Sequence, residues 1–309
     1  MLINQVSIIK FRLNIKVNAP QEFYYQLGWR VRGTQPGAHS SRTVGGNADF
    51  QSYVPFMQNP NPRRIDLRAT LRTVPHQLMS RSYYERGAVA VYSVLDLSAS
   101  MRFSGSSEKL DLLADIVASI AWSAVRSGDL FGVVACDNVV RSDLFEAPTH
   151  RLGLAEEIRE KLLANQQRSR SINQSAQPVG ASALPLAAEQ LRQKRSLVFL
   201  ISDFHLSDAL IRQTLASLIH HDVVPLVIWD SEEYSNIPHW GWLRVRDMED
   251  GGTRSLFMRP SLVRKIQENY ASRRKSITAL CLKAGIRTPF FIEDTFKAEQ
   301  LTRHLLEAN

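Results

Sequence analysis

Cysteine is nearly absent from this chain of 309 residues, which contains only Cys136 and Cys281. Both lie in apolar stretches, so no disulfide framework is expected and a reducing compartment fits best. Long apolar runs are also absent, because no stretch reaches the ~18 residues that a membrane-spanning helix needs. The N-terminus lacks the apolar core and the small-residue cleavage site of a signal peptide. These absences predict a cytoplasmic protein without a membrane span.

Several enzyme motifs are missing as well. The chain has no Walker sequence, the glycine-rich loop that binds nucleotide phosphates. Residues 103–107 read Phe-Ser-Gly-Ser-Ser, which lacks the Gly-x-Ser-x-Gly order of a serine nucleophile elbow. His220 and His221 are neighbours at the end of a predicted helix, where their side chains diverge and cannot both face one metal ion. We therefore expect a protein that binds a partner and is not an enzyme.

Positive charge exceeds negative charge only in the first part of the chain. Residues 1–87 contain 12 Lys and Arg against 4 Asp and Glu, whereas residues 88–309 contain 26 of each. This excess indicates either a solubilising surface or a docking surface for an acidic partner. Nucleic acid is a less favoured partner, because no named nucleic-acid motif with interleaved aromatic residues occurs. If a nucleic acid did bind, four arginines would contact its phosphates: Arg63, Arg64, Arg68 and Arg72.

From residue 88 onward, short apolar runs alternate with helical patterns. Nearly continuous apolar runs are typical of strands buried on both faces of a parallel sheet, and they cover residues 88–95, 130–135, 196–202 and 223–229. Helical spacing of apolar residues follows in residues 108–124, 155–163, 184–193, 206–220, 260–284 and 295–307, with a further strand at 288–292. This alternation predicts an α/β fold with a doubly wound, mostly parallel sheet.

The first 87 residues do not follow this alternation. Apolar and basic residues alternate over residues 9–17, which predicts a strand with a basic outer face. Residues 33–46 and 59–62 are rich in Gly, Pro and Asn, which indicates a β-rich or irregular elaboration packed on the rest of the chain. We predict a smaller, β-rich, basic region over residues 1–87 and an α/β domain over residues 88–309. Residues 168–177 and 231–238 are predicted to be surface loops of that domain.

Two of the predicted strands end in aspartate. Asp96 ends the first strand and is followed at alternate positions by Ser98 and Ser100, while Asp203 ends the strand over residues 196–202. Ser182 lies between them, in a loop before a predicted helix. Ligands of open α/β sheets bind at the carboxyl ends of the strands, so these five side chains are expected at one edge. Their hard oxygen atoms suit Mg²⁺, Mn²⁺ or Ca²⁺ better than Zn²⁺.

This pattern resembles the metal-ion-dependent adhesion site of von Willebrand factor A domains. The resemblance covers residues 88–309 as fold and the five positions above as site, although the family usually has Thr where this chain has Ser182. It implies a von Willebrand factor A-type, Rossmann-like sheet with Mg²⁺ as the favoured ion. Two carboxylates balance the charge of the ion, and neutral hydroxyls keep it electrophilic. An acidic residue of a protein partner would occupy the open position.

A second resemblance extends into the N-terminal part. Residues 45–50, Tyr53 and residues 63–70 (Arg-Arg-Ile-Asp-Leu-Arg-Ala-Thr) are similar to the bacterial family labelled domain of unknown function fifty-eight. The family usually shows Trp where this chain has Leu67. Its members are associated with MoxR-type AAA+ ATPases. The resemblance therefore implies an adaptor that works beside such an ATPase in chaperone-like maturation or assembly.

Three other interpretations remain open beside nucleic-acid binding. A metal-dependent phosphohydrolase of the aspartate type would need a second Asp two residues after Asp96, where this chain has Ser98. Asp96 and Asp203 could instead cap the helices that follow them. A metal could also be purely structural and never meet a partner. We predict a non-enzymatic, metal-dependent protein-binding adaptor.

Overall fold

The computed structural model of the protein describes residues 19–29, 36–58, 60–75, 77–102, 109–151, 153–172, 180–191, 193–234, 239–246 and 253–307. The strand predicted over residues 9–17 lies outside these residues. A six-stranded sheet forms the centre of the molecule, built from β3 (Ala90–Asp96), β4 (Leu130–Cys136), β5 (Glu146–Thr149), β6 (Leu197–Ser202), β7 (Asp222–Trp229) and β10 (Phe290–Glu293). Its order is β10-β7-β6-β3-β4-β5, and all neighbours are parallel except β4 and β5.

Both faces of the sheet are buried, which explains why its strands read as continuous apolar runs. In β3, Val91 and Leu95 join the hydrophobic cluster on one face, whereas Tyr92 and Val94 join the cluster on the other. Successive side chains of a strand point to opposite faces, so a doubly covered strand needs apolar residues at every position. All seven residues of β3 are buried accordingly.

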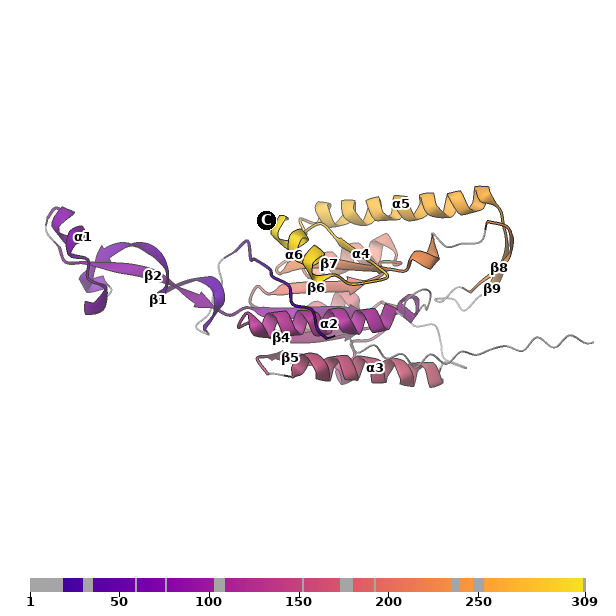
Figure 1. The fold of residues 1–309 in the computed structure, drawn as a ribbon, viewed down its shortest axis with the longest axis horizontal. Coiled ribbons are helices and arrows are strands. Elements are labelled where there is room, and N and C mark those ends of the chain that lie inside the picture. Colours follow the sequence, from indigo (N-terminus) through magenta and orange to yellow (C-terminus); the bar gives the residue numbers. More distant parts are fainter. Residues whose placement is uncertain are drawn as a thin grey trace, which may run out of the picture.

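Helices cover the two faces in two layers (Figure 1). One face carries α2 (Lys109–Arg126), α3 (Leu154–Ile172) and α6 (Ala298–Glu307). The other carries the 3-10 helix η5 (Leu184–Gln190), α4 (Asp208–Ser217) and α5 (Pro260–Lys283). The predicted α/β architecture with a mostly parallel sheet is confirmed. Among the described residues, none of the helices has the length and apolarity that crossing a membrane requires.

The strand order reverses beside β3. The chain passes from β3 to its neighbour β4 through α2, and later reaches β6 on the opposite side of β3. Helices that run in opposite directions from two adjacent strands leave a crevice outside the carboxyl ends of those strands. The carboxyl ends of β3 and β6 are therefore the place where this sheet is suited to hold a ligand.

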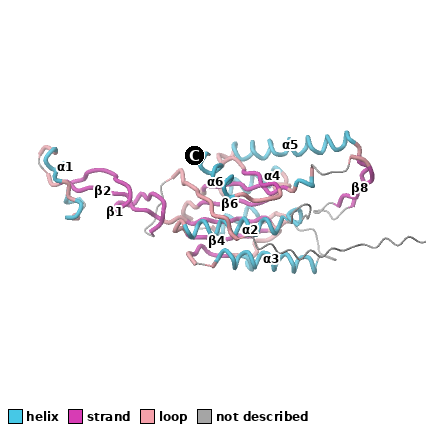
Figure 2. The backbone as a smooth tube through the Cα atoms, viewed as in Figure 1, coloured by secondary structure: helices cyan, strands magenta, loops and turns pink. Residues whose placement is uncertain are grey.

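Residues 36–87 form an arm that projects from this body (Figures 1 and 2). Strands β1 (Pro36–Pro55) and β2 (Met79–Gly87) pair antiparallel in a two-stranded sheet of their own. Between them, η1 (Phe56–Gln58), η2 (Pro62–Arg64) and α1 (Leu67–Arg72) make a small tip. Since β2 leads directly into β3, the arm leaves the body at the amino ends of the parallel strands.

The fully buried carboxylate of Asp129 joins the base of the arm to the body. Its Oδ1 accepts a hydrogen bond from the Val89 backbone N–H at 2.8 Å. Its Oδ2 accepts from the Tyr25 hydroxyl at 2.5 Å and lies 2.7 Å from Nε2 of His39 on β1. Burial, followed by the nearby charge of Asp129, raises the pKa of Tyr25 well above its usual value, so this phenol keeps its proton and stays a donor. One side chain thus connects three separate segments.

Residues 36–46 belong to β1, where register shifts on both sides of Val44 make the pairing with β2 irregular. One sequence prediction is wrong in its extent. The loop predicted over residues 168–177 is helical as far as Ile172, because no Pro or Gly interrupts α3 there. The sequence patterns also do not indicate the hairpin of β8 (Gly241–Arg246) and β9 (Thr253–Met258).

Candidate metal centre

Two buried carboxylates lie at the carboxyl ends of adjacent strands. Asp96 is the last residue of β3, and Asp203 directly follows the last residue of β6. The two strands are in register as far as the pair Leu95 and Ile201, so the next residues, Asp96 and Ser202, emerge side by side. Asp96 and Asp203 are both 0% exposed. Because this edge is the point of reversed strand order, the sheet places both carboxylates where its crevice opens.

Hydroxyl groups surround the first of these carboxylates. Oδ1 of Asp96 accepts a hydrogen bond from the backbone N–H of Ser98 at 2.9 Å, and Oδ2 accepts from the hydroxyl of Ser202 at 2.6 Å. The Ser98 and Ser100 hydroxyl oxygens are 3.1 Å apart. The turn after β3 therefore folds back on its own aspartate and presents two serine oxygens beside it. Four of the five predicted ligands, Asp96, Ser98, Ser100 and Asp203, are brought to one place.

The electrostatics of the pair reflect two negative charges in a dry environment. Burial and, second, the charge of Asp203 raise the pKa of Asp96 to about 6, against the opposing effect of the Ser202 and Ser98 hydrogen bonds. Burial is also the largest effect on Asp203 and acts to raise its pKa, but Lys109, His205 and the hydrogen bonds that Asp203 accepts together outweigh it, so the pKa of Asp203 is lowered overall. A buried carboxylate pair of this kind is stabilised by a cation placed against it.

Lys109 supplies one such positive charge, and the sequence predictions do not include it. Its side chain is 1% exposed, and its ammonium lies 3.2 Å from Oδ2 of Asp203 and 2.6 Å from Oε1 of Glu233. Lys109 is the first residue of α2 and lies on the buried face of that helix, three and four residues before the buried Leu112 and Leu113. A lysine on the apolar face of an amphipathic helix was the signal available in the sequence, because burial of an ammonium requires carboxylate partners.

Glu233 belongs to a second group of side chains, which contacts Lys109 and the backbone of Asp203. It ends the 3-10 helix η6 (Ser231–Glu233) and accepts a hydrogen bond from the Tyr270 hydroxyl of α5 at 3.3 Å. Trp229, at the end of β7, donates from its indole to the backbone carbonyl of Asp203 at 2.9 Å. The ring of His205 stacks on Trp229 with centroids 6.2 Å apart. These contacts hold the backbone at Asp203 and the side chain of Glu233, the two carboxylate residues that pair with Lys109.

Ser182 occupies a different position from the other four predicted ligands. It is exposed, and its hydroxyl donates to Oδ1 of Asn138 at 3.4 Å. The same oxygen accepts from the backbone N–H of Gly180 at 3.0 Å, which ties this loop to the turn after β4. No hydrogen bond joins the Ser182 hydroxyl to Asp96 or Asp203 in the described part of the chain. The loop hydroxyl is therefore near the same sheet edge but beside the neighbouring strand.

The spacing of two of the converging oxygens is compatible with a small divalent cation. For a metal with bonds of about 2.1 Å in octahedral geometry, adjacent ligand atoms are about 3.0 Å apart. The distance of 3.1 Å between the Ser98 and Ser100 oxygens matches that spacing. Among the described residues, no three side chains of His, Cys, Asp or Glu gather around one point to hold a metal. An ion at this edge would therefore need serine hydroxyls and an outside ligand to complete its coordination.

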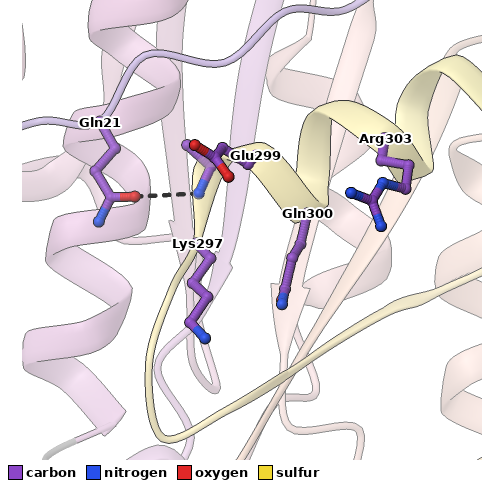
Figure 3. A pocket seen from close by; sticks show the side chains of 6 residues that line it. Gln21, Lys297, Glu299, Gln300 and Arg303 are labelled. Carbon is purple, nitrogen blue, oxygen red and sulfur yellow. Dashed lines mark hydrogen bonds between the residues drawn. The ribbon is translucent and has the colours of Figure 1, made fainter.

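A hollow elsewhere on the molecule is separate from this cluster. It has a volume of about 450 Å³ and is lined by the first turns of α6 and by Gln21, as Figure 3 shows. Both polar atoms of the Gln21 side-chain amide bond to the start of α6. The oxygen accepts from the Ala298 N–H at 3.1 Å, and the nitrogen donates to the Phe296 carbonyl at 3.3 Å. Its lining side chains include none of the predicted ligands, so the hollow is not part of the candidate metal centre.

Comparison with solved structures gives distant similarities. The chain is 12% identical to the conserved hypothetical protein BatB from Bacteroides thetaiotaomicron, with 72% of this chain and 98% of that chain covered at a TM-score of 0.40. An aerotolerance-related membrane protein from Bacteroides fragilis NCTC 9343, carrying multiple mutations to serines, is 13% identical over 72% of this chain and 98% of its own, with a TM-score of 0.34. Proximal thread matrix protein 1 from the mussel byssus is 16% identical, covering 45% and 37% at a TM-score of 0.32.

Comparison at the sequence level gives the family. No curated protein matches the chain. The model of the family described as Protein of unknown function DUF58 matches residues 55–276, which include the tip of the arm and the strand ends at Asp96 and Asp203. Because this match spans well over half of its length, the chain belongs to the family of proteins of unknown function DUF58.

Proposed function

We propose that this protein is a non-enzymatic adaptor that binds another protein through a divalent metal ion, with Mg²⁺ as the favoured ion and Mn²⁺ or Ca²⁺ as substitutes. The ion would be held by Asp96, Ser98, Ser100 and Asp203. One observation carries the proposal: two fully buried carboxylates and a close pair of serine hydroxyls meet where the strand order reverses. We interpret this site as an adhesion site of the von Willebrand factor A type. This interpretation rests on the arrangement above and on the sequence resemblance.

The charge balance of the cluster favours binding over catalysis. A bound divalent ion would act as an electrophile that accepts a carboxylate from the partner. Asp96 and Asp203 offset its charge, while Ser98 and Ser100 contribute oxygens without adding negative charge. Ser202 orients Asp96 by donating to its Oδ2 at 2.6 Å, which leaves the carboxylate fixed but still negatively charged. The ion would thus stay electrophilic and keep an open coordination position for an Asp or Glu of the partner.

Ser182 has a conditional place in this proposal. Its hydroxyl is engaged with Asn138 at 3.4 Å, a long and weak hydrogen bond on an exposed loop. Release from Asn138 is needed before this oxygen could join the other four residues. We therefore assign metal binding to the four converged side chains and treat Ser182 as a ligand that the loop would have to deliver.

The partner proposed from the family resemblance is a MoxR-type AAA+ ATPase. The adaptor would then act in the cytoplasm, in chaperone-like maturation or assembly of other proteins, while the ATPase hydrolyses the nucleotide. This division of labour agrees with the lack of a Walker sequence in the chain. It also gives the metal centre a defined role, because an acidic side chain of the ATPase or of a client protein would complete the coordination.

Calorimetric titration of Mg²⁺ and Mn²⁺ into the chelator-treated protein tests the metal centre. Saturable binding to the wild type and its loss in Asp96→Ala are expected. Asp129→Asn is the matched control, because it removes an equally buried carboxylate at the opposite edge of the sheet. Pull-down of the ATPase with and without chelator then tests the partner. Normal metal binding by Asp96→Ala, or chelator-resistant capture of the ATPase, would contradict the proposal.

A further inference from the structure

The tip of the arm, residues 55–79, exposes large apolar side chains to solvent. Four of them are Met57 (87% exposed), Leu67 (68%), Leu71 (73%) and Val74 (88%). Leu67 and Leu71 are one helical turn apart on α1, so they share one side of that helix. Single exposed apolar residues are common on proteins, but several on one small tip mark a surface that binds something.

A network of hydrogen bonds holds α1 in the orientation that exposes Leu67 and Leu71. Asp66 caps α1 by accepting from the Ala69 N–H at 2.9 Å, and it also accepts from Nε of Arg81 on β2 at 2.8 Å. Thr70 accepts from the Met79 N–H at 3.0 Å, which turns this side of α1 toward β2. The inward side of the helix is thus polar and tied down, so Leu67 and Leu71 are held outward.

Positive charge accompanies the apolar side chains. Arg63, Arg68 and Arg72 are exposed on the tip, and Arg68 and Arg72 are one turn apart on α1, next to Leu67 and Leu71. The one carboxylate in the sequence of residues 55–79 is Asp66, which is buried and paired with Arg81. The tip therefore presents apolar and cationic groups together, without an exposed anion among its described residues.

The position of the tip decides what kind of surface it can reach. It lies at the far end of the arm, where Figure 1 shows it as an extreme point of the described molecule. The arm leaves the body at the amino ends of the parallel strands, whereas the metal centre lies at their carboxyl ends. The tip cannot contribute to the metal centre of its own chain, but nothing of the described body stands between it and a broad, flat surface.

We propose that the tip of the arm binds the surface of an anionic phospholipid membrane, with Leu67, Leu71 and Val74 entering the headgroup region and the arginines contacting lipid phosphates. Interfacial binding of this kind requires exposed apolar side chains beside basic ones, and it strengthens with the anionic lipid content. The end of a projecting arm can reach this fluid surface directly, whereas a protein partner would need a matching acidic groove. The proposal is independent of the metal centre and involves contact with the membrane, not a span.

Co-sedimentation of the full chain with lipid vesicles tests the proposal. One set of vesicles is pure phosphatidylcholine, and the other contains equal amounts of phosphatidylcholine and phosphatidylglycerol. Binding to the anionic vesicles is expected, and it should weaken about tenfold or more when Leu67, Leu71 and Val74 are all changed to Ser. Changing Arg63, Arg68 and Arg72 to Gln should weaken it to a similar degree. All these side chains are exposed, so unchanged thermal unfolding will show that the variants fold.

Matched controls separate the tip from the general positive charge of the protein. Leu282→Ser and Arg212→Gln remove an exposed leucine and an exposed arginine from the body, and both should bind vesicles like the wild type. A solvatochromic label on Leu71→Cys reports insertion directly, because the two native cysteines are buried. A shift of its emission to shorter wavelength is expected on the anionic vesicles.

Three outcomes would overturn the proposal. Failure of the wild type to bind anionic vesicles would leave an acidic protein surface as the occupant of the tip. Equal binding by the wild type and the serine variant would show attraction by charge elsewhere on the chain. An unshifted label in the vesicle-bound protein would show that the apolar side chains stay in water.

Discussion

At the scale of single residues, Lys109 is the clearest case of a side chain whose partners define its role. Its ammonium lies between Asp203 and Glu233, with 1% of the residue exposed. An ammonium buried so deeply needs both carboxylates to offset its loss of hydration, and Asp203 needs the ammonium in return. The same arrangement makes Lys109 a built-in competitor of any cation that binds Asp203.

Replacing Lys109 by Met should therefore destabilise the metal-free protein by about 3 kcal/mol, because Asp203 and Glu233 lose the charge that pairs with them. A divalent ion should restore much of this stability, since it would bind more tightly where no ammonium competes. Urea unfolding with and without Mn²⁺ measures both effects. Lys109→Arg keeps the charge and serves as the control. A loss of stability in Lys109→Met that Mn²⁺ leaves unchanged would contradict the competition.

At the scale of elements, residues 19–29 are attached to the body by hydroxyl groups on two helices. The Gln21 and Phe23 backbone N–H groups donate to Ser119 and Ser123 of α2, each at 3.0 Å. The Tyr24 N–H donates to Thr302 of α6 at 3.1 Å. These side chains give an irregular segment the acceptors that a neighbouring strand would otherwise supply.

Ser123→Ala should lower the free energy of unfolding by about 1–3 kcal/mol, because the buried N–H of Phe23 would lose its acceptor. Ser217→Ala is the comparison, since that hydroxyl only donates to the Thr214 carbonyl within α4 at 2.9 Å. Urea denaturation of the two variants gives the difference. Equal effects of both substitutions would show that the segment does not depend on this acceptor.

At the scale of the whole molecule, a buried carboxylate joins the base of the arm to the body. Asp129 joins Tyr25, His39 and Val89 through one carboxylate, whereas Asp66 organises the distant tip. A two-stranded sheet has little stability by itself, so its attachment to the body decides how firmly the arm is held. The direction of the arm, and with it the position of the tip, is therefore sensitive to Asp129.

Asp129→Asn should loosen the arm, because an amide offers one acceptor oxygen in place of two and turns an NH₂ toward the other donors. We expect a loss of about 2 kcal/mol and faster hydrogen exchange along β1 and β2, with little change in the six-stranded sheet. In Asp66→Asn, faster exchange should be confined to the tip. Hydrogen exchange with mass spectrometry distinguishes the two patterns. Identical patterns would mean that Asp129 does not fix the arm.

The sequence by itself determined five of the six strands of the central sheet, all but β5, and the positions of Asp96 and Asp203 at their ends. A strand covered on both faces must be apolar throughout, and this is a local property that a short window of sequence reveals. Placement of the aspartates at the ends of two such runs follows from the same pattern. The tight turn from Asp96 to Ser100 is local as well, which is why its serines lie where the sequence predicts them.

Only the tertiary structure decided which groups gather around these aspartates. Lys109 and Glu233 are 124 positions apart in the numbering of the chain, and their contact depends on how α2 and η6 pack at the same edge. Ser182 lies beside the turn after β4 because its hydroxyl donates to Asn138. Likewise, β1 pairs with β2 through irregular register shifts. Contacts between distant segments depend on packing and loop paths, which local periodicity does not encode.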